Sequence, residues 1–262
     1  MPSQSDRSNW LKGPKAPCDP VDPPPRRYNL VLLGAPGVGK GTQAALLSAR
    51  LGACHLSTGD IFRAARTLAP CDRTPALTAA VEAMQRGELV SDETVLDLVR
   101  ERADCFRCNG GFLLDGFPRT LRQAEALGRL LEDEGVTLDA VLMYELPVEE
   151  VVARIGGRRV CPACKAVYRV TGQPPRAEGV CDACGAALIQ RDDDRPEAVR
   201  VRMETYLQAT LPLVAHYRAL GLLIPIPADG EPEEIYGRTM SALERAGMGL
   251  PSPGSTDAGD TP

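Results

Sequence analysis

The chain has 262 residues, of which 44% are hydrophobic and 25% charged, and its formal net charge is -5. This balance is ordinary for a soluble globular protein, and it argues against a surface built to hold duplex nucleic acid, which is usually basic. No apolar run has the length of a membrane span, and the N-terminus lacks the apolar stretch of a signal peptide. We therefore expect a cytoplasmic protein that binds neither membranes nor nucleic acid.

Both ends of the chain are rich in proline, serine and charge. Residues 1–27 contain PCDPVDPPPRR, and residues 249–262 contain PSPGSTDAGDTP. Such segments cannot bury enough apolar surface to offset the entropy lost on ordering. We expect two disordered tails around a folded part that spans residues 28–248.

Short apolar runs alternate with helical patterns inside the folded part. The helix expected at residues 39–51 ends at Gly52, and another begins at Pro147. The expected strands cover residues 28–33, 112–114, 140–146 and 222–226. Apolar strands that alternate with helices indicate an α/β fold, with a parallel sheet covered on both faces.

Two stretches interrupt this alternation. Residues 58–90 are helical without a strong strand, and residues 158–191 are rich in turns and hold two cysteine pairs. We expect both to be insertions that project from the sheet. The core would then consist of residues 28–57, 91–157 and 192–248.

A glycine-rich loop follows the first expected strand and precedes the first helix. Its members are Gly34, Ala35, Pro36, Gly37, Val38, Gly39, Lys40, Gly41 and Thr42. Glycines let the backbone N–H groups wrap a phosphate, the helix N-terminus adds positive potential, and Lys40 supplies a charge for the outer phosphates. The pattern fits a phosphate-binding P-loop, with Gly41 at the usual Ser/Thr position. It predicts a nucleotide-binding protein without naming the reaction.

Further motifs follow the loop in order. They are LSTGD at 56–60, FRAA at 62–65, GELVSDE at 87–93, GFLLDGFPRT at 111–120 with Gln123, GRR at 157–159 and RDDDRPE at 191–197 with Arg202. With GAPGVGKGTQA at the loop, this ordered set over about 220 residues resembles adenylate kinases. The resemblance implies a P-loop NTPase-like sheet with a helical AMP-binding arm and a lid as insertions. It also implies phosphoryl transfer from MgATP to AMP by a monomer, with ATP, AMP and ADP as its ligands.

The resemblance also assigns roles to residues. The catalytic set would be Lys40, Asp115, Arg119, Arg158, Arg191 and Arg202. The glycine-rich loop would bind ATP together with Arg154, Arg158, Val167 and Tyr168. AMP would be held by Thr58, Arg63, Gly87, Glu88, Leu89, Val90, Gly116, Phe117, Arg119, Gln123, Arg191 and Arg202.

Several of these assignments have a simpler alternative. Asp115 is a Mg²⁺ partner through water or only a turn-forming residue before Gly116. Tyr168 covers the ATP base or merely packs in a hairpin. His55 and His216 belong to no nucleophile–base motif, so we interpret both as structural.

Two C-x₂-C pairs occupy the turn-rich insertion. Cys161, Cys164, Cys181 and Cys184 have sixteen residues between the pairs, which lies within the range of structural zinc sites. Disulfides or unrelated thiols are the alternative, and iron would fit the same ligands. We expect a structural Zn²⁺ in a zinc-ribbon-like lid. A third pair, Cys105 and Cys108, has no partner pair nearby and is taken as incidental.

Two other functions remain open. One is a nucleoside monophosphate kinase for UMP, CMP or GMP, or one that uses GTP as the donor. The other is a zinc-ribbon module that binds nucleic acid, which the acidic balance and the intact glycine-rich loop oppose. The stretch at residues 67–75 is longer than the family's usual link, so it leaves the affinity of the arm for AMP open.

Overall fold

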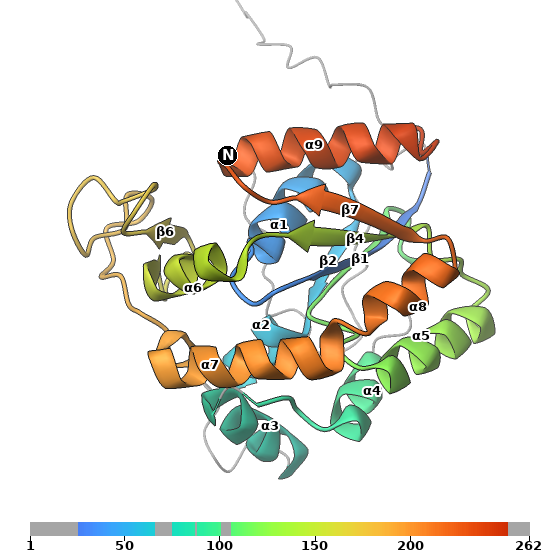
Figure 1. Cartoon of the computed structure of the whole chain (residues 1–262), viewed down its shortest axis with the longest axis horizontal. Coiled ribbons are helices and arrows are strands. Elements are labelled where there is room, and N and C mark those ends of the chain that lie inside the picture. The colour runs from blue at the N-terminus through green and yellow to red at the C-terminus, as the bar shows by residue number, and fades with distance from the viewer. Residues whose placement is uncertain (1–25, 66–74, 87, 101–105, 251–262) are drawn as a thin grey trace, which may run out of the picture.

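The computed structural model describes residues 26–65, 75–86, 88–100 and 106–250. Its centre is a parallel five-stranded sheet in the order β2-β3-β1-β4-β7 (Figure 1). The strands are β1 (Tyr28–Gly34), β2 (Cys54–Ser57), β3 (Gly111–Asp115), β4 (Ala140–Glu145) and β7 (Leu223–Pro227). The expected α/β sheet is therefore confirmed.

Alternate residues of β1 face two separate cores, because successive side chains of a strand point to opposite faces. Leu30 and Leu32 pack with α1 (Lys40–Leu51) and α9 (Pro232–Arg245). Val31 and Leu33 belong to the core on the other face. The helices that contribute to that core are α2 (Thr58–Ala65), α3 (Pro75–Arg86), α4 (Asp92–Arg100), α5 (Leu121–Asp133) and α8 (Leu213–Ala219). Helices thus cover both faces of the sheet (Figure 1).

Strand β2 was not expected from the sequence. Its four residues, CHLS, are too few and too polar to form an apolar run. The strand exists because it pairs with β3, in the register Cys54↔Phe112 to Ser57↔Asp115. Its strand conformation therefore depends on a tertiary neighbour, as is common for β structure.

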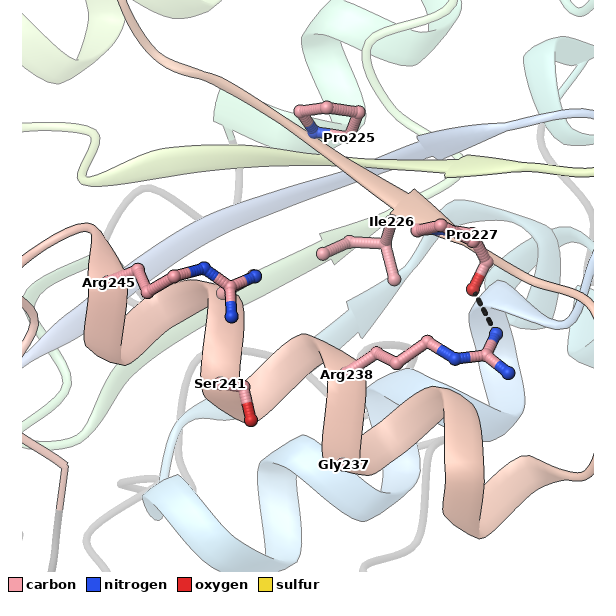
Figure 2. A pocket seen from close by; sticks show the side chains of 8 residues that line it. Pro225, Ile226, Pro227, Gly237, Arg238, Ser241 and Arg245 are labelled. Atoms are coloured by element: carbon pink, nitrogen blue, oxygen red, sulfur yellow. Dashed lines mark hydrogen bonds between the residues drawn. The ribbon is translucent and has the colours of Figure 1, made fainter.

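Strand β7 forms the opposite edge and contains Pro225 and Pro227. Leu222 accepts a hydrogen bond from β4, and the N–H of Ala228 donates one back to it, so the even-numbered positions face β4. The two prolines therefore occupy positions whose N–H groups would point to solvent, where proline is tolerated and blocks further strand pairing. The carbonyl of Pro227 accepts a hydrogen bond from Arg238 of α9 (Figure 2).

The two expected insertions lie at different places on this core. Helices α2 and α3 form the described part of residues 58–90, and α3 lies against the 3₁₀ turn η4 (Asp192–Asp194) and α7 (Pro196–Thr205). The cysteine-bearing segment follows α6 (Val148–Gly156) and includes an antiparallel hairpin, β5 (Arg158–Val160) and β6 (Val167–Arg169). It projects from one side of the molecule (Figure 1).

The packed part of the chain reaches slightly beyond residues 28–248. Arg26 pairs with Asp139, and the Tyr28 hydroxyl donates to the carbonyl of Gly249 over 2.6 Å. No helix in the described ranges is long and apolar enough to cross a membrane. The remaining residues of the expected tails, most of the 67–75 stretch, and Cys105 lie outside the description.

Candidate active site and cysteine cluster

The glycine-rich loop joins the centre of the sheet to α1, as expected. Gly34 ends β1 with a φ of 140°, and a Cβ there would lie 2.5 Å from the carbonyl oxygen of Tyr144. Gly37 has a φ of 78°, and its Cβ would lie 2.2 Å from Cγ1 of Ile155. Only glycine fits at both positions, because any side chain would meet both strain and a close neighbour.

Lys40 begins α1 and folds its side chain back over the loop. Its Nζ donates to the carbonyls of Gly34 (2.7 Å) and Ala35 (2.9 Å). Burial lowers the pKa of Lys40 to about 8. The negative charge of Asp115 raises this pKa, and the guanidinium groups of Arg119, Arg202 and Arg158 lower it further. Charged groups from three distant parts of the sequence therefore act on this ammonium.

Asp115 ends β3 beside the loop, since it pairs in register with Leu32 of β1. A Cβ on Gly41 would lie 3.4 Å from Asp115 Oδ2, so a small residue at position 41 leaves room for this carboxylate. Burial opposes the ionisation of Asp115, but nearby His55 and Lys40 outweigh it and hold the pKa of Asp115 below 3.8. The carboxylate is thus charged at neutral pH.

His55 is a site residue that the sequence reasoning missed. Its side chain is 4% exposed, and Nε2 lies 3.5 Å from Asp115 Oδ2. The histidine reaches this position because it lies on β2, the strand that the sequence did not predict. Recognition of β2 as the neighbour of β3 was the one signal that could have found it.

Asp194 is the second missed residue. Its buried carboxylate accepts from both Nε (2.8 Å) and Nη2 of Arg158, and Arg202 Nη1 lies 3.2 Å from its Oδ1. Asp193 also contacts Arg202, over 3.1 Å. The run of three aspartates beside Arg191 was the available signal, because closely spaced arginines need counter-charges when no anion is bound. Arg191 itself lies immediately before η4.

The expected AMP residues meet around Gly116, which follows β3. The carbonyl of Gly116 accepts from Thr58 Oγ1 (3.0 Å) and from Arg119 Nε (2.8 Å). Gln123 Oε1 accepts from the backbone N–H of Arg119 (2.8 Å), while its Nε2 donates to Asp92 (2.7 Å). The Gln123 amide is therefore already engaged on both ends and keeps one N–H and one lone pair for another partner.

The other predicted residues are more dispersed. Glu88 is exposed and pairs with Arg86, whose Nε lies 2.9 Å from its Oε2. Arg154 Nη1 donates to the carbonyl of Ala228 over 2.9 Å. Phe117 is buried, Leu89 and Val90 are half-buried, and Val167 is exposed. Gly87 and the side chain of Arg63 lie outside the described structure.

The four lid cysteines form a compact cluster. Their Sγ atoms all lie within 4.8 Å of one another, with 3.4 Å between Cys161 and Cys184 and 3.5 Å between Cys164 and Cys181. These distances exceed the roughly 2.05 Å of a disulfide bond, and all four are free thiols. The disulfide alternative is therefore wrong for these cysteines.

Tyr168 is engaged by this cluster. Its hydroxyl lies 3.4 Å from Cys181 Sγ and accepts the backbone N–H of Asp182 over 2.9 Å. The hydrogen bond from this hydroxyl is the largest of the effects that lower the pKa of the Cys181 thiol. Tyr168 thus joins hairpin β5–β6 to the second cysteine pair, a role that neither of its two expected readings included.

Known proteins resemble most of this chain in sequence. The family model described as "Adenylate kinase" matches residues 32–222. A protein named adenylate kinase from Streptomyces avermitilis is 49% identical over 217 residues, which cover 82% of this chain and 97% of that protein. Proteins named adenylate kinase from Streptomyces griseus and Carboxydothermus hydrogenoformans are 49% and 47% identical to this chain. The matches cover 84% and 82% of this chain, and 99% of each of those proteins. The chain belongs to the adenylate kinase family.

Proposed function

We propose that this protein catalyses the reversible transfer of the terminal phosphoryl group of MgATP to AMP, which gives two ADP. The observation that carries the proposal is a set of arginines near Lys40 and its glycine-rich loop, at the carboxyl ends of parallel strands. Arg158 and Arg202 meet on Asp194, Arg119 bonds to Gly116 after β3, and all three guanidinium groups help to lower the pKa of Lys40. Ligands of open α/β sheets bind at this edge. Family membership is in accord with the same reaction.

The chemistry requires positioning and charge neutralisation more than covalent participation by the protein. A phosphate monoester has its second pKa near 6, so the AMP phosphate is mostly a dianion at neutral pH and needs no general base to attack. MgATP and AMP together carry about four negative charges. Lysine and arginine side chains must offset this repulsion, and planar guanidinium groups pair with phosphate oxygens bidentately.

Each cluster of basic groups has a part in this proposal. On the ATP side, Lys40 and the loop N–H groups hold the phosphates, while Arg154 and Arg158 approach from the lid. On the AMP side, Arg63 and Arg119 hold the phosphate, and Thr58 and Gln123 contact the base. Arg191 and Arg202 lie between the nucleotides. Asp193 and Asp194, which pair with these arginines in the structure, would release Arg158 and Arg202 to the phosphates.

Magnesium fits beside the loop. Bound with ATP, Mg²⁺ would neutralise part of the phosphate charge. Asp115 would hold it through water, because its carboxylate is ionised, half-buried and adjacent to the loop at Gly41. Nε2 of His55 lies 3.5 Å from Oδ2 of the same carboxylate.

Zinc fits the cysteine cluster. A tetrahedron with Zn–S bonds of about 2.3 Å has sulfur–sulfur edges of roughly 3.8 Å. The sulfur atoms here are only slightly closer at their shortest, 3.4 Å, and span no more than 4.8 Å. Four thiolates leave no open position, so the ion would be structural. It would hold the lid, residues 158–191, together.

The two insertions would close over the nucleotides, the arm at residues 58–90 over AMP and the lid over ATP. The core of residues 28–57, 91–157 and 192–248 would remain the fixed support. A cytoplasmic location belongs to the same proposal, because free thiols that hold a metal suit a reducing compartment. We expect a monomer, which size-exclusion chromatography with light scattering would test.

A coupled assay of nucleoside diphosphate formation tests the function directly. The purified chain is supplied with MgATP and, separately, with AMP, UMP, CMP or GMP, and then with MgGTP and AMP. We expect the highest kcat/KM for MgATP with AMP. Preference for another acceptor or donor would instead favour the second candidate, a different nucleoside monophosphate kinase. No diphosphate formation with any pair would refute both.

A further inference from the structure

Thr210 lies at an unusual point of the long helical segment behind the site. Helix α7 passes into a π-helical turn at Tyr206–Thr210, η5, before α8 begins at Leu213. The N–H of Leu211 donates to the carbonyl of Tyr206 over 2.8 Å, five residues earlier. Single π turns inside helices are rare and occur frequently at functional sites. Thr210 is the last residue of this turn and is 8% exposed.

The Thr210 side chain does not bond to its own helix. Its Oγ1 donates to the backbone carbonyl of Arg119 over 3.0 Å, across 91 residues of sequence. For comparison, Thr205 on the same helical segment donates to the carbonyl of Val201, four residues earlier, over 2.7 Å. The hydroxyl of Thr210 therefore links η5 to the segment that carries Arg119, whereas the hydroxyl of Thr205 bonds within its own helix.

The backbone of Arg119 is held from both sides as a result. Gln123 of α5 accepts its N–H, and Thr210 of η5 donates to its carbonyl. The Arg119 side chain is in turn oriented by the bond from Nε to the carbonyl of Gly116. Because the turn follows α7, the segment that carries Arg202 also fixes the backbone from which Arg119 extends.

We propose that Thr210 is a positioning residue for Arg119. By holding the carbonyl of Arg119, it aims the guanidinium group at the phosphate of the acceptor nucleotide, and it ties that aim to the helix bearing Arg202. The inference rests on the proposed function for the identity of the acceptor. It adds a residue outside all of the motifs that carry the family resemblance.

Thr210→Val tests this role, since valine keeps the shape of threonine and removes the hydroxyl. Loss of this part-buried bond, which leaves the Arg119 carbonyl without its Thr210 donor, should lower kcat/KM for AMP about tenfold. The loss should fall mainly on KM for AMP, with KM for ATP within about twofold of the parent. Thr210→Ser should restore the parent values, because it returns the donor. Thr210→Ala gives the same readout if the valine variant does not fold.

Thr205→Val is the matched control, because it removes a threonine hydroxyl from the same helical segment without touching Arg119. It should leave both KM values unchanged. Parent-like kinetics in Thr210→Val, an equal loss in Thr205→Val, or no rescue by Thr210→Ser would each overturn the inference. Those outcomes require an active parent enzyme. A parent chain without activity would refute the proposed function instead, so the two failures are distinguishable.

Discussion

The phosphate-loop region and the cysteine lid reach order by different physical means. Every residue of β1 is buried, and the loop it leads into contributes Val38 to one apolar cluster and Ala35 to another. In the lid, Val160, Cys161 and Cys181 are buried. Four of its larger apolar residues, Val167, Val170, Val180 and Ile189, are each at least 40% exposed, and Leu188 is half-buried. The lid has too little buried surface to order itself, so a bound metal is a sensible replacement for a core.

This difference between the loop and the lid indicates which residues should affect activity and which should affect stability. Lys40 is a half-buried charge that hydrogen-bonds to the glycine-rich loop, so its removal should affect activity far more than folding. A lid cysteine is a cross-link in a segment with almost no core, so its removal should affect local order first. The predictions below test this contrast, from the largest expected effect to the smallest.

Lys40→Ala should produce the largest effect. We expect kcat/KM for ATP to fall by at least about 100-fold, as when a preorganised charge donor to a transition state is lost. Tm should stay the same or rise, because a desolvated ammonium is removed from the fold. Steady-state kinetics and thermal unfolding measure the two quantities. Arg129→Ala, at an exposed position of α5, is the control and should change neither. A Lys40→Ala enzyme with native kinetics would contradict the site.

Cys161→Ser should disrupt the lid and spare the core. We expect the parent to contain about one zinc per chain and the variant to lose it, because three thiolates no longer close the tetrahedron. Limited proteolysis followed by mass spectrometry should then find new cleavage within residues 158–191. Cys108→Ser, outside the lid, should keep both the metal and the protection. Elemental analysis that finds no metal in the parent would remove the basis of this prediction.

The pH dependence of activity should reveal Lys40. Its pKa in the free enzyme is about 8 instead of 10.5. The ammonium is therefore lost as pH rises through 8, and kcat/KM for ATP should fall on that alkaline limb. Lys40→Arg should move the limb to higher pH, whatever its absolute rate, since guanidinium remains protonated. A limb at the same pH in both proteins would assign it to another group.

Stability should respond to the same group with the opposite sign. Between pH 8 and 10.5 the unfolded chain binds more protons at Lys40 than the folded protein does. The free energy of unfolding contributed by this residue therefore rises with pH across that window. Denaturant unfolding of the parent and of Lys40→Ala at pH 8 and pH 10 would isolate this contribution. Deprotonation of Lys40 should therefore lower activity and raise the free energy of unfolding as pH increases.

Tyr168→Phe should give the smallest effect. The phenol joins Cys181 to Asp182, and groups that orient metal ligands typically contribute about 10–100-fold to metal affinity. We expect zinc transfer to a coloured chelator to become at least several-fold easier, while kcat stays near the parent value. Tyr236→Phe, on α9, serves as the control for loss of a phenol elsewhere. An unchanged metal affinity would make Tyr168 a packing residue only.

Most of the residues to which we assign the chemistry were predicted from the sequence before the fold was known. Lys40, Asp115 and the lid cysteines occur in spaced motifs, because phosphate cradles and metal turns are local structures made by neighbouring residues. His55 was missed because it lies on a strand that exists only through pairing. Asp194 and Thr210 were missed because each has a partner far away in the sequence, 36 residues away for Asp194 and 91 for Thr210. The engagement of Gln123 with Arg119 and Asp92 was equally invisible, since α4 and α5 meet only in the folded protein.

Local pattern was enough for the family, the phosphate cradle and the cysteine cluster, since each depends on residues close together in the chain. Strand order, the counter-charges held against the arginines, and the two-sided support of Arg119 came only from the folded structure. They depend on which distant segments touch. Those contacts form because both faces of the sheet must be buried at the same time. This requirement involves the whole chain and cannot be read from any short stretch of the sequence.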